Sequence, residues 1–158
     1  MGTTNLDILE LGGTLAVTGA TTFTGAVTTA ATQAIPIKFA ETVAFGDFTD
    51  GGGAAGTIAL TNTIPVGAFV VCALCTAITG FAGDVSAVVT LGDGSDADRY
   101  NTGTPSVFAT AAAGVALGVP SGVQYHATGA TITVTITTNA NFTAVSAGSL
   151  TLEFYYLT

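Results

Sequence analysis

The stretch TITVTITT, Thr131–Thr138, alternates threonine with β-branched apolar residues along most of its length. Successive side chains of an extended backbone point to opposite faces, so Ile132, Val134 and Ile136 share one face and threonines occupy the other. Val, Ile and Thr are also the residues that favour strands. The pattern therefore predicts a strand that is buried on one face and covered by threonine on the other.

The C-terminal stretch SLTLEFYYLT, Ser149–Thr158, follows the same rule. Its inward positions are Leu150, Leu152, Phe154 and Tyr156. Of its last two aromatic rings, alternation turns only Tyr155 outward, where it could contact a sugar or a protein.

Further apolar runs are separated by the glycine-rich turns DGGGAAG, GFAGD, GDGSD and VPSG. They predict additional strands at Ile37–Phe45, Thr57–Thr61, Ala68–Ile78, Val85–Leu91, Val107–Ala109 and Val123–His126. Roughly eight short strands with turn signals predict an all-β fold, a β-sandwich or jelly roll, over residues 36–158.

Charged residues make up only 8% of the chain, against about 25% in an average soluble domain. Lys38 and Arg99 are the only basic residues among ten acidic ones, and the net charge is −8. Binding to nucleic acid needs several cations to neutralise phosphates, and anionic membranes need the same. We therefore expect neither nucleic acid nor a membrane surface as a partner.

The start, MGTTNLDILELGG, lacks the basic and apolar regions of a signal peptide. The run VGAFVVCALCTAI, Val66–Ile78, is shorter than the roughly 20 residues of a membrane helix. It predicts a buried strand or a bent pair of strands. We expect synthesis and folding in a cytoplasm.

A glycine recurs at every sixth position near the start, at Gly13, Gly19 and Gly25, in the hexads GTLAVT, GATTFT and GAVTTA. An isolated extended segment of this kind is unstable in water and must pair, most simply with identical neighbours. Residues 1–35 are therefore interpreted as an extended assembly arm. A flexible Gly/Thr linker and an ordinary hairpin are the alternatives.

The pattern GxLxVTGxTxxTGxV in these hexads resembles short repeats of bacteriophage fibre, spike and head-decoration proteins. In those families three chains wrap extended segments around a threefold axis. The segment TLGDGSDADRYNTG, Thr90–Gly103, is also similar to a segment of jelly-roll domains in phage structural proteins.

The resemblance implies a homotrimeric virion protein on the capsid surface. Its expected function is that of a decoration or cement protein that binds the major capsid protein and stabilises the head. A tail or head fibre module that recognises a host glycan or protein is the alternative, and a bacterial adhesin domain is a third. The apolar positions expected at the assembly interface are Leu6, Ile8, Leu9, Leu11, Leu15, Val17, Phe23 and Val27.

Three carboxylates, Asp93, Asp96 and Asp98, lie in one glycine-containing loop. Such oxygens can hold calcium, although the spacing is not that of an EF-hand. The alternative is that they cap backbone amides of the turn, with Arg99 paired to Asp96 or another nearby carboxylate.

The motif CALC places Cys72 and Cys75 three residues apart, a spacing found in zinc and redox sites. On a strand these positions face opposite ways, which favours two buried free thiols. His126 has no evident partner, and no GxSxG elbow is present. We therefore expect no enzyme activity, no cofactor and no dedicated metal site.

Overall fold

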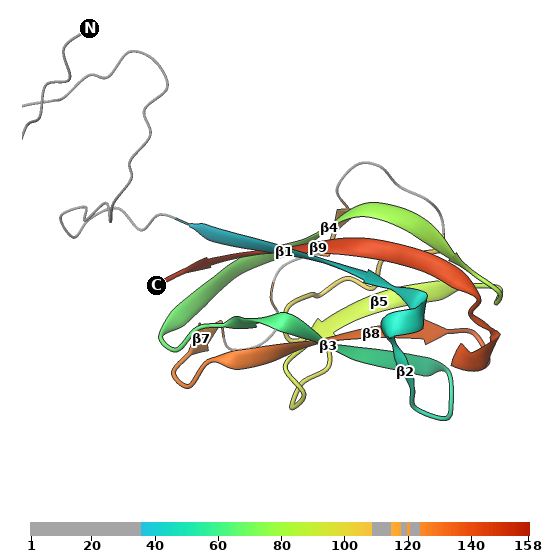
Figure 1. The fold of residues 1–158 in the computed structure, drawn as a ribbon. Helices are drawn as coiled ribbons and strands as arrows, with labels where there is room; N and C mark the ends of the chain where they lie inside the picture. Colours follow the sequence, from blue (N-terminus) through green and yellow to red (C-terminus); the bar gives the residue numbers. More distant parts are fainter. Residues whose placement is uncertain (1–35, 109–114, 118–119, 121–123) are drawn as a thin grey trace, which may run out of the picture. The chain divides into compact units, whose positions relative to one another are not determined.

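The computed structural model describes residues 36–108, 115–117, 120 and 124–158, which form an all-β sandwich of two antiparallel sheets (Figure 1). The predicted fold class is confirmed. The proposed boundary at residue 35 and the assembly arm lie outside the described residues. Two short 3-10 turns, Phe45–Asp47 and Phe142–Ala144, interrupt the strands. Within the described part of the chain, no helix has the length and apolar character to cross a bilayer.

The first sheet has β9 between β1 and β4, and two very short strands pair with the far edge of β4. Its strands are β1 (Ile37–Ala44), β9 (Ala147–Leu157), β4 (Ala68–Ala82), β6 (Val115–Ala116) and β7 (Tyr125–His126).

The second sheet has the order β2-β3-β8-β5. Its strands are β2 (Thr49–Asp50), β3 (Ala55–Ile64), β8 (Ala130–Thr138) and β5 (Ala87–Gly92). At the β5 edge, Ser106 forms a bridge to Val88. The predicted strand at 107–109 is thus reduced to an isolated bridge one residue earlier, and residue 109 lies outside the described part.

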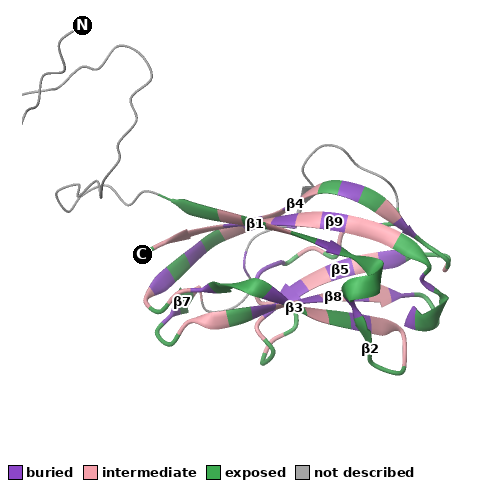
Figure 2. Ribbon diagram, in the orientation of Figure 1, coloured by how far each residue is buried: buried purple, intermediate pink, exposed green. Residues whose placement is uncertain are grey.

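The core lies between the two sheets, where the buried positions of facing strands meet (Figure 2). In β8, the inward residues Ile132, Val134 and Ile136 have no exposed surface, as the alternation with threonine predicts. In β9, Phe154 is equally buried, and Phe39 of β1 stacks on its ring at 5.3 Å between centroids. Burial of side chains of this size contributes about 1.5–3 kcal/mol each.

From Ala68 onward, after a turn at Val66 and Gly67, the apolar run at 66–78 lies in a single bulged strand, β4. Its pairing with β9 shifts by one residue at three places: between Val70 and Cys72, between Thr76 and Thr79, and between Thr79 and Ala82. Each shift reverses which face receives the next side chain. A strand that is apolar at almost every position can therefore keep filling the core. Its buried residues are Ala68, Val70, Ala73, Cys75, Ile78 and Phe81.

Candidate assembly surface

The outer face of the first sheet carries a row of exposed apolar side chains at the end where β1 begins and β9 ends. The strand register places Phe69 of β4 directly opposite Tyr125 of β7 on one side and Leu157 of β9 on the other. Phe69 is 42% exposed and Tyr125 is 56% exposed. Directly opposed residues of neighbouring strands share a face, so these three side chains form one contiguous group.

The first bulge of β4 enlarges this group. Val70 and Ala73 are both buried, so the two residues between them, Val71 and Cys72, both point outward opposite Tyr155. Val71 is 41% exposed and Cys72 is half-buried. Bulges commonly re-aim a side chain in this way, and here the bulge adds an apolar side chain to the solvent face. We call Phe69, Val71, Tyr125 and Leu157 the Phe69 patch.

A polar group borders the patch on the same face. Lys38 Nζ lies 3.1 Å from Glu153 Oε1, and the Tyr155 hydroxyl donates to Glu153 Oε2 at 2.8 Å. The hydrogen bond from Tyr155, together with Lys38, lowers the pKa of the Glu153 carboxyl, and Glu153 raises the pKa of Lys38. Tyr155 thus faces outward, as alternation predicts, but its hydroxyl is bonded within its own chain. One cation and one anion leave this region without net charge.

The predicted carboxylate loop is held together by its own hydrogen bonds. Asp93 Oδ1 accepts from the Ser95 amide at 3.2 Å, the Ser95 hydroxyl at 2.8 Å and the Asp96 amide at 3.1 Å. Asp93 Oδ2 lies 2.7 Å from Arg99 Nε. Arg99 therefore pairs with Asp93, a nearby carboxylate as the sequence predicts, and the first carboxylate of the loop caps backbone amides.

A metal role for Asp93, Asp96 and Asp98 stays a prediction. In residues 36–108, 115–117, 120 and 124–158, no three His, Cys, Asp or Glu side chains are grouped so that they could hold a metal ion.

His126 has a partner that sequence reasoning missed. The Tyr100 hydroxyl lies 3.3 Å from His126 Nε2, and both residues are buried. Burial lowers the pKa of His126, and the nearby charge of Arg99 lowers it further. Tyr100 is separated from His126 by 26 residues, so no local motif links them. The pair anchors β7 to the loop after β5, which is a structural role.

The two cysteines differ in environment. Cys75 is fully buried, and burial raises the pKa of its thiol to about 12. Cys72 is only half-buried because the bulge turns it outward, so the expectation of two buried thiols holds for Cys75 alone. Both thiols are free.

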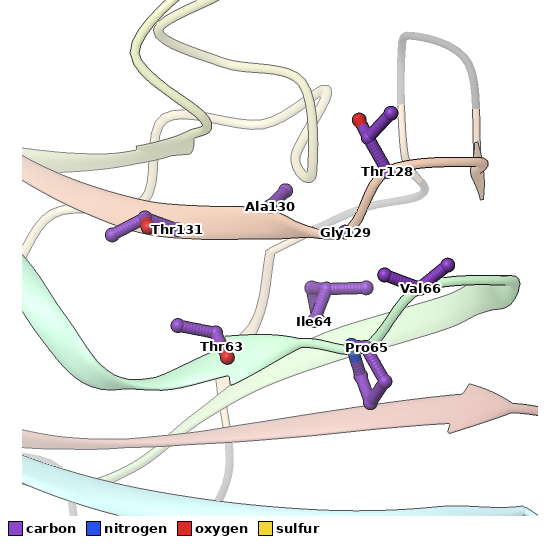
Figure 3. A pocket seen from close by; sticks show the side chains of 8 residues that line it. All are labelled: Thr63, Ile64, Pro65, Val66, Thr128, Gly129, Ala130 and Thr131. Carbon is purple, nitrogen blue, oxygen red and sulfur yellow. The ribbon is translucent and has the colours of Figure 1, made fainter.

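An open hollow of about 410 Å³ lies where β3 ends and β8 begins (Figure 3). Threonine hydroxyls, the Pro65–Val66 turn and Gly129 form its walls, and none of its lining side chains is ionisable. The hollow therefore offers no ionisable acid or base.

The predicted interface residues Leu6, Ile8, Leu9, Leu11, Leu15, Val17, Phe23 and Val27 all lie outside the described residues. The surface residues Phe69, Val71 and Tyr125 were not singled out from the sequence. The only signals for them were the unbroken apolar run of β4 and an aromatic residue beside His126.

The sequence matches no family model and no curated protein. Among solved structures, a chain titled "Cyanophage Pam1 capsid asymmetric unit" is similar, with a TM-score of 0.44 and 20% identity. The similarity covers 87% of this chain and 97% of that chain. A likeness of this size does not bear on function, which is argued from the residues of this chain.

Proposed function

We propose that this chain is a structural protein of a bacteriophage particle, a capsid decoration or cement protein. It binds the head surface as a homotrimer, contacts the major capsid protein and stabilises the shell. The observation that carries the proposal is the Phe69 patch, an exposed apolar group on a sandwich that follows phage-like glycine hexads. Contiguous apolar surface of this kind marks a site of protein contact.

The arm supplies the second element of the proposal. Its large apolar residues, such as Leu15, Val17 and Phe23, have no basic neighbours and no catalytic partners. Burying each on association contributes about 1.5–3 kcal/mol. Three arms that bind together multiply that contribution through avidity. The arm holds the trimer to the particle, and the sandwich projects outward.

The surface chemistry of the sandwich suits a molecule present in many copies. Its solvent faces are rich in threonine, and long charged side chains are few. Little side-chain entropy is therefore lost when copies associate. The net charge of −8 keeps decorated particles mutually repelling and soluble.

The copy number on separated heads and tails tests this function. Particles that carry the chain are disrupted, heads are separated from tails, and the chain is quantified in each fraction. Decoration predicts hundreds of copies on heads and a matching gain in resistance of the shell to heat. A few copies confined to tails would contradict decoration.

The alternative function is a fibre module that recognises a host glycan or protein. The exposed rings of Phe69 and Tyr125 favour it, because exposed aromatic faces are common contacts for sugars and proteins. This function predicts that the purified protein binds host cells. It also predicts that Tyr125→Ala reduces that binding while the copy number on heads stays low.

A further inference from the structure

We propose that a second copy of this chain packs on the Phe69 patch, with Lys38 of one copy meeting Glu153 of the partner subunit. The inference deepens the homotrimer part of the proposed function, and it does not depend on binding to a capsid. It assigns the contact between copies to the outer face of the first sheet, next to the start of β1.

The apolar side chains of the patch are neighbours, not scattered residues. Phe69, Tyr125 and Leu157 lie side by side across three strands, and the bulge of β4 places Val71 beside them. Tyr and Phe are favoured in protein interfaces because each ring covers a large area with few rotatable bonds. The row of threonines farther along the same face, joined by the 2.8 Å bond between Thr42 and Thr151, is polar. The apolar contact area therefore ends at the Lys38–Glu153 pair.

The distribution of charge selects a second copy as the occupant. Each copy carries a net charge of −8, so two copies repel wherever acidic residues meet. On the described strands of this face the charged side chains are Lys38 and Glu153, and they compensate each other. The other carboxylates of the sandwich lie in turns, in the short strand β2 of the second sheet and in the Asp93 loop or, at Glu41, bond to β3. Two acidic molecules therefore meet less repulsion on this face than on the faces and turns that carry uncompensated carboxylates.

The face is also self-complementary. Lys38 and Glu153 lie 3.1 Å apart, and their side chains are 47% and 18% exposed. Around a threefold axis, Lys38 of each copy can pair with Glu153 of the next, since a closed head-to-tail contact repeats the same pair of surfaces. Arg99, the other basic residue, pairs with Asp93 at 2.7 Å and its side chain is only 18% exposed, against 47% for Lys38. Lys38 is thus the cation that a second acidic copy meets.

The course of the chain agrees with this contact. β1 begins at Ile37, which pairs with Tyr156, the neighbour of Leu157. The start of β1 therefore lies at the margin of the patch.

The first experiment measures the mass of the full-length protein in solution by sedimentation equilibrium. We expect the wild type to form a closed oligomer. Val71→Lys, which introduces a cation into the apolar contact, should weaken association by at least about 100-fold. Val85→Lys is the matched control, because Val85 is 73% exposed on a turn outside the patch. Thermal unfolding of both variants checks that the sandwich is retained.

A charge exchange tests the pairing itself. Lys38→Glu places two anions on the face, and Glu153→Lys places two cations there. Each variant alone should associate more weakly than the wild type, while an equimolar mixture of the two should form mixed oligomers. A mixture that associates more tightly than either variant alone is the result expected if the two side chains meet across copies. A mixture that stays as weakly associated as its components would overturn the pairing.

Cys72 provides a reporter within the patch. Its labelling rate with a maleimide should fall as the wild-type concentration rises and should be independent of concentration in Val71→Lys. Equal protection of Cys72 in the wild type and in dissociated Val71→Lys would overturn the proposal, because a segment of the same chain would then cover the patch. A monomeric wild type would overturn it as well. If that monomer still decorates heads, the decoration function survives and only the contact between copies is rejected.

Discussion

The carboxylate of Glu41 in β1 accepts two hydrogen bonds from Asn62 in β3, from its backbone amide at 2.9 Å and its side-chain amide at 2.8 Å. The backbone amide of Thr61 donates to the other carboxylate oxygen at 2.8 Å. The pairing of β3 with β8 shifts between Ala59 and Thr63, so Thr61 and Asn62 lie in a bulge outside the ladder. Glu41 thus joins the two sheets along the β1 side of the sandwich.

Glu41→Ala should lower the free energy of unfolding by about 1–2 kcal/mol at pH 7, because hydrogen bonds to a charged group are lost. Burial raises the pKa of Glu41, but the amides of Asn62 and Thr61 together outweigh it, so the pKa lies below its usual 4.5. A carboxyl whose pKa is lower in the folded protein than in the unfolded chain stabilises the fold at any pH above its pKa in the unfolded chain. That stabilisation is lost as the pH falls through the folded pKa.

Urea unfolding of wild type and Glu41→Ala at pH 7 and at pH 3 measures this dependence. The difference between the two proteins should shrink at pH 3. Thr42→Ala, on the neighbouring outward position of β1, is the control, since its hydroxyl does not titrate. An equal loss from Glu41→Ala at both pH values would contradict a role for the carboxylate charge.

The close approach of β9 to β4 requires glycine at position 148. Gly148 has φ +130°, and a Cβ there would lie 2.5 Å from the Phe81 ring and 2.7 Å from its Cα. Gly148→Ala should therefore destabilise the fold by about 2–4 kcal/mol through strain and overpacking. Gly46→Ala is the matched control, because a Cβ at Gly46 has no atom within 4 Å. Thermal unfolding measures both variants. We expect a lower melting temperature for Gly148→Ala and an unchanged one for Gly46→Ala.

The ionisation of His126 can be measured directly, because it is the only histidine of the chain. Burial, and then the charge of Arg99, should hold its pKa below 6.5. Above the pKa that His126 has in the unfolded chain, the neutral ring contributes its full stabilisation to the fold. That stabilisation is lost as the pH falls through the lower pKa that His126 has in the folded protein. An NMR titration of the imidazole protons gives the value, and Arg99→Gln should raise it. A pKa at or above 6.5 in the wild type would show that the ring is solvated.

The sequence predicted the strands well where one face is buried, because a period of two is unambiguous there. Thr131–Thr138 and Ser149–Thr158 lie in β8 and β9 almost residue for residue. Bulges escaped prediction, since the three register shifts of β4 depend on β9 and leave no local signal. The Phe69 patch could not be predicted because it also depends on these bulges. An apolar run with no alternation does not show which of its residues face water until the positions of the bulges are known.

Asn101 should be essential for the loop that follows β5. It is 1% exposed, its side-chain oxygen accepts from the Leu91 amide at 2.7 Å, and its amide donates to the carbonyls of Val89 and Gly103. Asn101→Ala leaves these buried groups without partners and should cost about 2–4 kcal/mol. The exposed Asn139→Ala should change stability by less than about 0.5 kcal/mol. Equal urea midpoints for the two variants would contradict this.

The assembly arm makes a prediction on particles. Deleting residues 1–35 should leave a folded sandwich, seen as a retained cooperative thermal transition, and abolish binding to heads. Phe23→Asp in the full chain should act in the same direction, because burial of an unpaired carboxylate is strongly unfavourable. Thr22→Asp adds the same charge on the opposite side of an extended hexad and is the matched control. Cosedimentation with undecorated heads measures binding. If Phe23→Asp saturates heads as the wild type does, the hexad face is not buried in the assembly.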